Sequence, residues 1–92
     1  MKLTPEVSIC IATFNGEKYL SETLETLSRQ TFRDIEVIVA DDGSDDSTCD
    51  VVSDWVREVR FPVRLLRSET NEGPSAAYSR SFAAAHGEFL AV

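Results

Sequence analysis

Basic residues are scarce in this chain of 92 residues. Its 16 acidic side chains outnumber its 9 lysines and arginines, and the formal net charge is −7 at pH 7. This balance excludes a nucleic-acid backbone or an anionic membrane as the main partner, because both would repel the chain. It still allows a nucleotide that binds together with a divalent cation, since the cation supplies the missing positive charge.

Cysteine, histidine and long apolar runs are scarce as well. Cys10 and Cys49 lack metal-type spacing, so we expect two inert thiols in a reducing, cytoplasmic setting. The single histidine, His86, stands beside Gly87, where a surface or capping role is expected rather than catalysis. No signal peptide is visible, and no apolar run is long enough to cross a membrane. The hydrophobic fraction of 42% nevertheless suffices for the core of one domain.

Strand-like and helix-like segments alternate along the chain. The predicted strands are 7–12, 35–40, 63–67 and 88–92. The predicted helices are 17–29, 46–59 and a third that begins at Gly73-Pro74 and stops at Gly87. This β-α-β-α-β-α-β order predicts an α/β fold with a doubly wound, mostly parallel sheet and right-handed crossovers. The least apolar strand, 63–67, is expected at an edge of the sheet.

Local signals predict how these elements begin, end and pack. Asn15 is expected to cap the first helix, and Ser44 or Asp45 the second. Gly87 is expected to provide a left-handed stop for the third helix. Two packing predictions complete the set: Phe32 anchors its link in the core, and one stripe of the second helix carries Val52, Val56 and Val59.

One stretch joins a buried strand to reactive side chains. The apolar run 35–40 leads directly into Asp41, Asp42, Gly43 and Ser44. The two carboxylates would lie at the carboxyl end of the strand, where open α/β sheets bind ligands. There they can accept hydrogen bonds from ribose hydroxyls or a base N–H, or hold a metal. Acids before a helix are also typical of solvated turns and caps, so this stretch alone leaves both interpretations open.

Glycine is scarce in the loop after the first strand. Residues 12–16 contain only Gly16, so neither a dinucleotide-binding fingerprint nor a phosphate-binding P-loop is present. Phe14 offers a ring on which a base can stack, although it could instead pack against the first helix. Because Phe14 and Asp42 follow neighbouring strands, we predict that they lie close together at the carboxyl ends of these strands.

Three blocks of this sequence together resemble the family 2 glycosyltransferases. Residues 7–16 are similar to the opening strand and loop of that family, and residues 30–32 with 35–47 are similar to its second block. The third block consists of Asn71, Glu72, Gly73, Ala77, Ala85, Gly87 and Glu88. The resemblance implies the Rossmann-like GT-A fold and the transfer of a sugar from a nucleotide-diphosphate donor, with a UDP-sugar favoured, to an acceptor hydroxyl.

The resemblance also implies a nucleotide-sugar site. The Ala12 backbone and the side chains of Phe14, Glu17 and Asp42 would surround the base and ribose. Asp41 would support Asp42 or contact the ribose. Asn71 and Gly73 would shape the loop on the donor side. Together with two polar residues of the first loop, the candidate binding residues are Ala12, Thr13, Phe14, Asn15, Glu17, Asp41, Asp42, Asn71 and Gly73. No catalytic residue and no metal ligand is assigned within the chain.

The chain departs from the family pattern in two ways. Tyr78-Ser79 stand where the family often has Arg-Asn, and Arg80 lies two positions further on. The family's acidic metal-binding motif and its catalytic base would follow Val92. The resemblance therefore implies that residues 1–92 are a truncated, N-terminal nucleotide-sugar-binding part, inactive alone. The full-length enzyme would bind Mn²⁺ or Mg²⁺ through ligands beyond Val92.

Two other function classes require different residues or a different test. A phospho-accepting receiver needs acids after the first strand and one acceptor aspartate after the third, and the residues at 13–15 and 67–69 do not fit. A non-catalytic, doubly wound interaction module stays open as the alternative, and nucleotide titration would separate it from a transferase. The open edge of the fourth strand also favours self-association.

Overall fold

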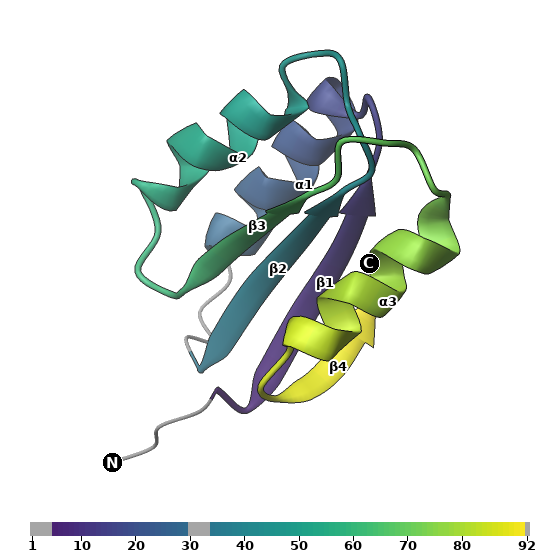
Figure 1. The fold of residues 1–92 in the computed structure, drawn as a ribbon. Coiled ribbons are helices and arrows are strands. Elements are labelled where there is room, and N and C mark those ends of the chain that lie inside the picture. Colours follow the sequence, from purple (N-terminus) through teal and green to yellow (C-terminus); the bar gives the residue numbers. More distant parts are fainter. Residues whose placement is uncertain (1–4, 30–33, 92) are drawn as a thin grey trace.

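The computed structural model describes residues 5–29 and 34–91, which form a parallel sheet with helices on both faces (Figure 1). The strands are β1 (Val7–Thr13), β2 (Ile35–Asp41), β3 (Val63–Arg67) and β4 (Glu88–Ala91), in the order β3-β2-β1-β4. The helices are α1 (Glu17–Arg29), α2 (Thr48–Val56) and α3 (Pro74–Ala84). Helices α1 and α2 cover one face and α3 the other, which confirms the predicted doubly wound α/β class (Figure 1).

Strand β2 lies inside the sheet and organises it. All of its residues are buried, as its mostly apolar run predicted, and they include the carboxylates of Glu36 and Asp41. It pairs in parallel with β1 from Val7↔Ile35 to Thr13↔Asp41, and with β3 on its other side. Strand β3 is therefore an edge strand, as predicted. The register brings the carboxyl ends of β1 and β2 side by side.

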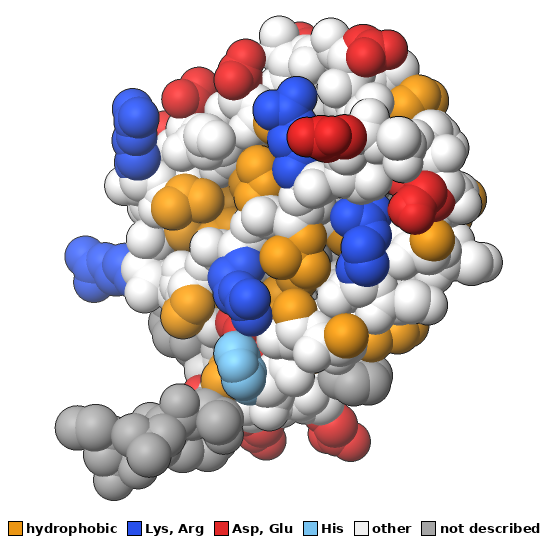
Figure 2. Space-filling model, in the orientation of Figure 1, with side chains coloured by type: hydrophobic (Ala, Val, Ile, Leu, Met, Phe, Trp, Pro, Cys, Tyr) orange, Lys and Arg blue, Asp and Glu red, His pale blue; other side chains and the backbone are white. Residues whose placement is uncertain are grey.

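The two faces of the sheet differ in what they bury. The apolar face packs against α1 and α2, and its buried residues are Ile9, Ile11, Ile35, Val37, Val39, Leu20, Leu24, Val52, Trp55 and Phe61. The small-residue face packs against α3, and its buried residues include Ser8, Cys10, Glu36, Ala77 and Ser81. Because side chains alternate along a strand, one sequence supplies both faces. Beside α3, hydrophobic and basic side chains over β2 and β3 reach the surface (Figure 2).

Helix α2 is shorter than the predicted 46–59. Asp46 lies before it and accepts hydrogen bonds from the backbone and hydroxyl of Thr48. The buried residues on its inner side are Thr48, Val52 and Trp55, whereas Val56 is 41% exposed. The predicted stripe was therefore wrong at Val56, because Trp55 occupies the inner position.

The predicted roles of several cap residues were also wrong. Asn15 has a positive φ, and its Oδ1 accepts the backbone N–H of Asp45 rather than one from α1. The residue at the N-cap of α2 is Ser47, not Ser44 or Asp45, and its side chain makes no capping bond. Asn15 is thus engaged by a distant part of the chain, whereas at the start of α2 the local carboxylate of Asp46 accepts the Thr48 N–H.

Gly87 is required for a reason other than the predicted one. Helix α3 ends at Ala84, and the described glycines with positive φ are Gly43 and Gly73. A Cβ on Gly87 would lie 2.7 Å from the carbonyl oxygen of Pro5, so this glycine permits a close approach of two backbone segments.

Some predictions fall outside the described residues. These are the anchoring of Phe32, the family block at 30–32, and residue 92 of the fourth strand. Within the described ranges, each helix is too short or too polar to span a bilayer.

Candidate functional site

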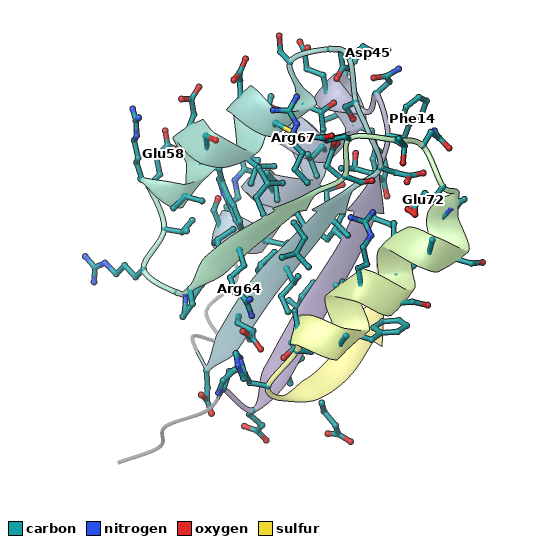
Figure 3. The ribbon with its side chains drawn as sticks, in the orientation of Figure 1. Phe14, Asp45, Glu58, Arg64, Arg67 and Glu72 are labelled. Atoms are coloured by element: carbon teal, nitrogen blue, oxygen red, sulfur yellow. The ribbon has the colours of Figure 1, made fainter. Side chains whose placement is uncertain are left out.

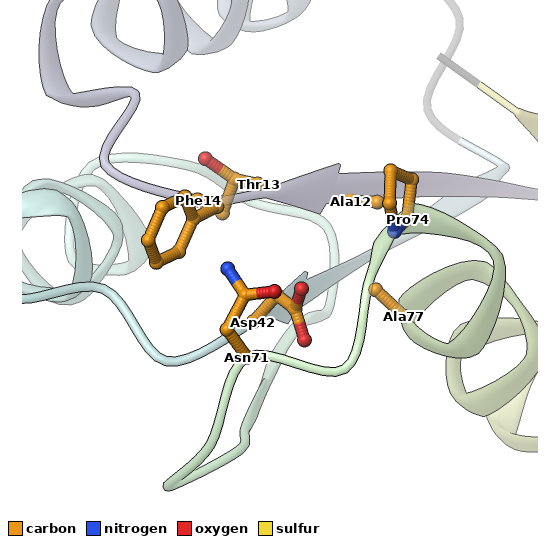
Figure 4. Close-up of a pocket in the computed structure, with 7 residues that line it drawn as sticks. All are labelled: Ala12, Thr13, Phe14, Asp42, Asn71, Pro74 and Ala77. Atoms are coloured by element: carbon orange, nitrogen blue, oxygen red, sulfur yellow. The ribbon is translucent and has the colours of Figure 1, made fainter.

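A pocket of about 170 Å³ opens at the carboxyl ends of β1 and β2, beside the first turn of α3 (Figure 4). Its lining residues are Ala12, Thr13, Phe14, Asp42, Asn71, Pro74 and Ala77. The structure thus brings Phe14 and Asp42 into one pocket, as the strand pairing predicted. Sequence reasoning missed Pro74 and Ala77, which belong to the helix that crosses over the sheet.

Phe14 provides the aromatic wall of this pocket. Its side chain is 47% exposed, more than a residue packed firmly against α1 would be. It follows the last residue of β1, and Figure 3 shows it at the tip of the first loop. The ring is therefore available for stacking with a planar ligand.

Asp42 provides the buried charge of the pocket. Its side chain is 5% exposed, and Arg80 Nη2 lies 3.9 Å from Oδ1. Oδ1 accepts the backbone N–H of Glu72 at 2.8 Å, and Oδ2 accepts that of Gly73 at 2.8 Å. These donors satisfy the buried carboxylate and tie the loop before α3 to the end of β2. Each oxygen keeps a further lone pair with which to accept a bond from a ligand.

Asp41 lies next to the pocket residues but has a different environment. It is fully buried, and its Oδ2 accepts the backbone N–H of Ser44 at 2.9 Å. Its Oδ1 accepts the Ser44 hydroxyl hydrogen. Both oxygens therefore build the turn after β2, and among the described residues Asp41 does not line the pocket.

A brace of hydrogen bonds joins the first loop to this turn. The Asn15 N–H donates to Ser44 Oγ at 2.8 Å, and Asn15 Oδ1 accepts the Asp45 N–H at 2.8 Å. Glu17 Oε1 accepts the Ser47 N–H at 3.1 Å. Asn15, Glu17 and Asp41 thus fix the turn after β2 and do not line the pocket. The spacing of Asp41 and Ser44, typical of a side-chain-closed turn, is the signal that could have identified the role of Ser44.

Two glycines shape the loops around Asp42. Gly43 has φ +83, and a Cβ there would lie 3.0 Å from the backbone of Thr70. Gly73 has φ +98 and stands at the N-cap of α3, where its N–H reaches Asp42. Other residues would be strained at both positions.

The thiols and the histidine lie apart from this chemistry. Burial raises the pKa of Cys10 and of Cys49, and the charge of Asp41 raises that of Cys49 further. Both cysteines are free, and a raised pKa opposes thiolate reactivity. His86 Nδ1 lies 3.1 Å from Glu36 Oε1, near the amino end of β2 and opposite the pocket. The cytoplasmic setting stays a prediction.

The arrangement of potential metal ligands is the last feature of the site. No group of three or more His, Cys, Asp or Glu side chains within 5–29 and 34–91 is arranged to hold a metal ion. Asp41 and Asp42 are both bonded to the surrounding loops. A metal site built from three or more such side chains is therefore absent from the described ranges.

Comparisons with known proteins identify the family of this sequence. The sequence profile of "Glycosyl transferase family 2" matches residues 8–92. The chain is 33% identical over 85 residues to the abequosyltransferase RfbV of Salmonella typhimurium, covering 90% of this chain and 26% of the relative. It is 30% identical over 86 residues to the glycosyltransferase GlyG of Streptococcus pneumoniae, covering 94% and 28%. The chain spans about a quarter of the length of the curated relatives it matches.

Solved structures share the fold. The crystal structure of S. aureus TarS 1-349 in complex with UDP-GlcNAc matches with a TM-score of 0.88 at 33% identity, over 95% of this chain and 26% of that one. A mannosyltransferase from Pyrobaculum calidifontis, in complex with GDP-Man and Mn²⁺, matches with a TM-score of 0.82 at 23% identity, over 92% and 26%. The second likeness is one of fold alone.

Proposed function

The chain belongs to the family 2 glycosyltransferases, and we propose that residues 1–92 are the N-terminal nucleotide-sugar-binding part of such an enzyme. The whole enzyme would transfer a sugar from a nucleotide-diphosphate donor to an acceptor hydroxyl. The observation that carries this proposal is the pairing of an exposed aromatic ring, Phe14, with a buried carboxylate, Asp42, in one pocket. The relative in complex with UDP-GlcNAc supports a UDP-sugar as the donor.

The pocket suits the nucleoside end of such a donor. The base stacks on Phe14, and Asp42 accepts a hydrogen bond from a base N–H, as a charge-assisted acceptor. A volume of about 170 Å³ is well below the roughly 300–1,000 Å³ of sites that enclose drug-sized ligands. The sugar and diphosphate would therefore extend beyond the described pocket. Thr13 and Asn71 line the remaining polar part.

We propose that the reaction uses two groups from outside the described residues. A divalent cation, Mn²⁺ or Mg²⁺, would stabilise the negative charge of the leaving diphosphate, and a carboxylate base would accept the proton of the attacking hydroxyl. The described residues contain no cluster of three or more potential metal ligands, and we propose that the metal ligands and the base both lie beyond Val92. The chain alone is then expected to bind the nucleotide without transferring the sugar.

Titration with UDP in the absence of metal tests this proposal. Asp42→Asn is expected to weaken binding about tenfold, because an amide oxygen accepts a hydrogen bond less strongly than a carboxylate. Asp54→Asn, the same change on the exposed side of α2, is the matched control and should bind as the wild type does. Equal titration curves for wild type and Asp42→Asn would remove Asp42 from the site.

The base itself provides a second test. Uracil and guanine carry a ring N–H that can donate to Asp42, whereas the corresponding ring nitrogen of cytosine is an acceptor. We therefore expect CDP to bind more weakly than UDP to the wild type, and the difference to shrink in Asp42→Asn. Equal affinity for both nucleotides in the wild type would contradict base recognition by Asp42.

We also propose self-association through β4. Among the described strands, β4 pairs with β1 alone, so its second edge carries unpaired backbone groups. Light scattering should detect a dimer or larger species whose population rises with concentration. A monomer at high concentration would contradict this proposal and leave the nucleotide site untouched.

A further inference from the structure

Arg80 lies on α3, one turn after the pocket residue Ala77, and faces Asp42. Its Nη2 is 3.9 Å from Asp42 Oδ1, and the two side chains are 32% and 5% exposed. Residue 80 lies on a different side of the helix from Tyr78, as the helical period predicts. Arg80 therefore places its positively charged guanidinium group beside the Asp42 carboxylate of the candidate site.

The guanidinium group of Arg80 is incompletely bonded. Its Nε and Nη2 are buried and have no hydrogen-bond partner among the residues that the structure describes. Buried donors without partners are unfavourable, and a distance of 3.9 Å is too long for a hydrogen bond. Attraction between opposite charges still acts over this distance where solvent is largely excluded. The attraction to the Asp42 carboxylate thus partly offsets the cost of the unpaired buried N–H groups of Arg80.

Asp42 depends on this arrangement in turn. Its other partners, the N–H groups of Glu72 and Gly73, belong to the loop before α3 rather than to a helix or strand. Arg80 is anchored on α3, which contacts both β1 and β2. It is the partner of Asp42 that is held by regular secondary structure.

We propose that Arg80 is a positioning residue for Asp42. It orients the carboxylate at the end of β2, so that the carboxylate can accept the base N–H while remaining bonded to the loop. This inference rests on the proposed nucleotide site. Arg80 does not line the pocket and acts on a ligand only through Asp42.

UDP titration of Arg80 variants is the first test. Arg80→Met and Arg80→Gln remove the charge and should weaken binding about tenfold, because Asp42 loses its charged partner. Arg80→Lys keeps the charge and should restore most of the affinity. Arg64→Met is the matched control, since Arg64 Nη1 donates to the carbonyl of Ala84 at the far end of α3. It should bind UDP as the wild type does.

A double-mutant cycle separates positioning from a general structural role. In the Asp42→Asn background, Arg80→Met should have little further effect on UDP binding, because its action passes through the Asp42 charge. If Arg80→Met weakens binding by the same factor in both backgrounds, the proposal is overturned. Thermal unfolding of each variant checks that the protein titrated is folded.

Hydrogen exchange supplies a test without nucleotide. The amides of Glu72 and Gly73 donate to Asp42, so they should exchange faster in Arg80→Met and Arg80→Gln than in the wild type or Arg64→Met. Unchanged exchange in both charge-free variants would overturn the inference. Failure of the wild-type protein to bind UDP would instead contradict the proposed function, so the two failures are distinguishable.

Discussion

The two faces of the sheet solve different problems with the same strands. The apolar face is covered by α1 and α2, whose buried residues include Leu20, Leu24 and Trp55. The small-residue face buries Ser8, Cys10 and Glu36 under α3. Burial of large apolar side chains supplies free energy without regard to function, whereas small and polar residues contribute less of it. The candidate pocket adjoins the second face, where α3 contributes only Ala77 and Pro74 to its wall.

The difference has a physical cause. An alanine or serine lets a helix lie close to the sheet and leaves room at its end for a ligand. The same smallness leaves a carboxylate, that of Glu36, buried beneath α3. Its Oε2 accepts the Ser8 hydroxyl at 2.6 Å and the backbone N–H of His86 at 2.7 Å, and its Oε1 lies 3.1 Å from His86 Nδ1. The small-residue face therefore relies on hydrogen-bond geometry where the apolar face relies on volume.

The largest expected effect is on the apolar face. Leu24 is 1% exposed, and Leu24→Ala should lower the free energy of unfolding by about 2–5 kcal/mol through lost burial and a residual cavity. Urea denaturation measures this loss, and Leu27→Ala on the same helix, where the side chain is only partly buried, should cost less. The UDP affinity of the folded fraction should not change. An equal loss for both variants would show that α1 is not packed as described.

Enlarging a residue on the small-residue face should cost less stability than Leu24→Ala but should abolish UDP binding. Ala77 is fully buried and lines the pocket, so Ala77→Leu should cost about 1–3 kcal/mol of stability by overpacking and also fill the pocket. Isothermal titration should show that UDP binding is lost in the folded protein. Ala83→Leu on the exposed side of α3 is the control and should keep both properties. Retained UDP binding in Ala77→Leu would place the nucleotide elsewhere.

A third change tests the hydrogen bonds under α3. Ser8 Oγ donates to Glu36 and accepts the Gly87 N–H at 2.8 Å, so Ser8→Ala leaves two buried groups short of a partner. The expected loss is about 1–3 kcal/mol in the free energy of unfolding. Ser21→Ala, on the exposed side of α1, should change stability little. A neutral Ser8→Ala would mean that water or a shifted backbone replaces the hydroxyl.

The sequence predicted the apolar face better than the small-residue face. The apolar run of β2 and the helix at 17–29 follow from local sequence patterns, and both elements form as predicted. The errors at Asn15 and Gly87 share a cause, because each residue has its partner far away in the chain, at Asp45 and Pro5. Distances between segments are not encoded in a local pattern, so a turn residue cannot reveal which segment it meets.

The candidate site was predictable only where it depends on the order of the strands. Phe14 and Asp42 follow adjacent parallel strands, and topology alone brings such positions together. The wall formed by Pro74 and Ala77 depends on the path of the crossover to α3, and the brace of Asn15 and Asp41 depends on turn geometry. Those features require coordinates. Whether the residues bind a nucleotide stays a prediction.

The smallest expected effect concerns acid. Burial opposes ionisation of Glu36, but hydrogen bonds from Ser8 and His86 outweigh it and lower the pKa of Glu36 below its usual value. A carboxyl with a lowered folded-state pKa contributes stability above its unfolded pKa of about 4.3, and this contribution is lost as pH falls through the folded value. Wild type should therefore lose more stability between pH 5 and pH 3 than Glu36→Gln, as measured by urea denaturation at each pH. Asp46 also has a lowered pKa, through its bond from Thr48, but it is present in both proteins and cancels in the comparison.

Glu22→Gln, an exposed change on α1, should follow the wild-type curve. Parallel curves for wild type and Glu36→Gln would show that the buried carboxylate on the small-residue face does not couple folding to protons.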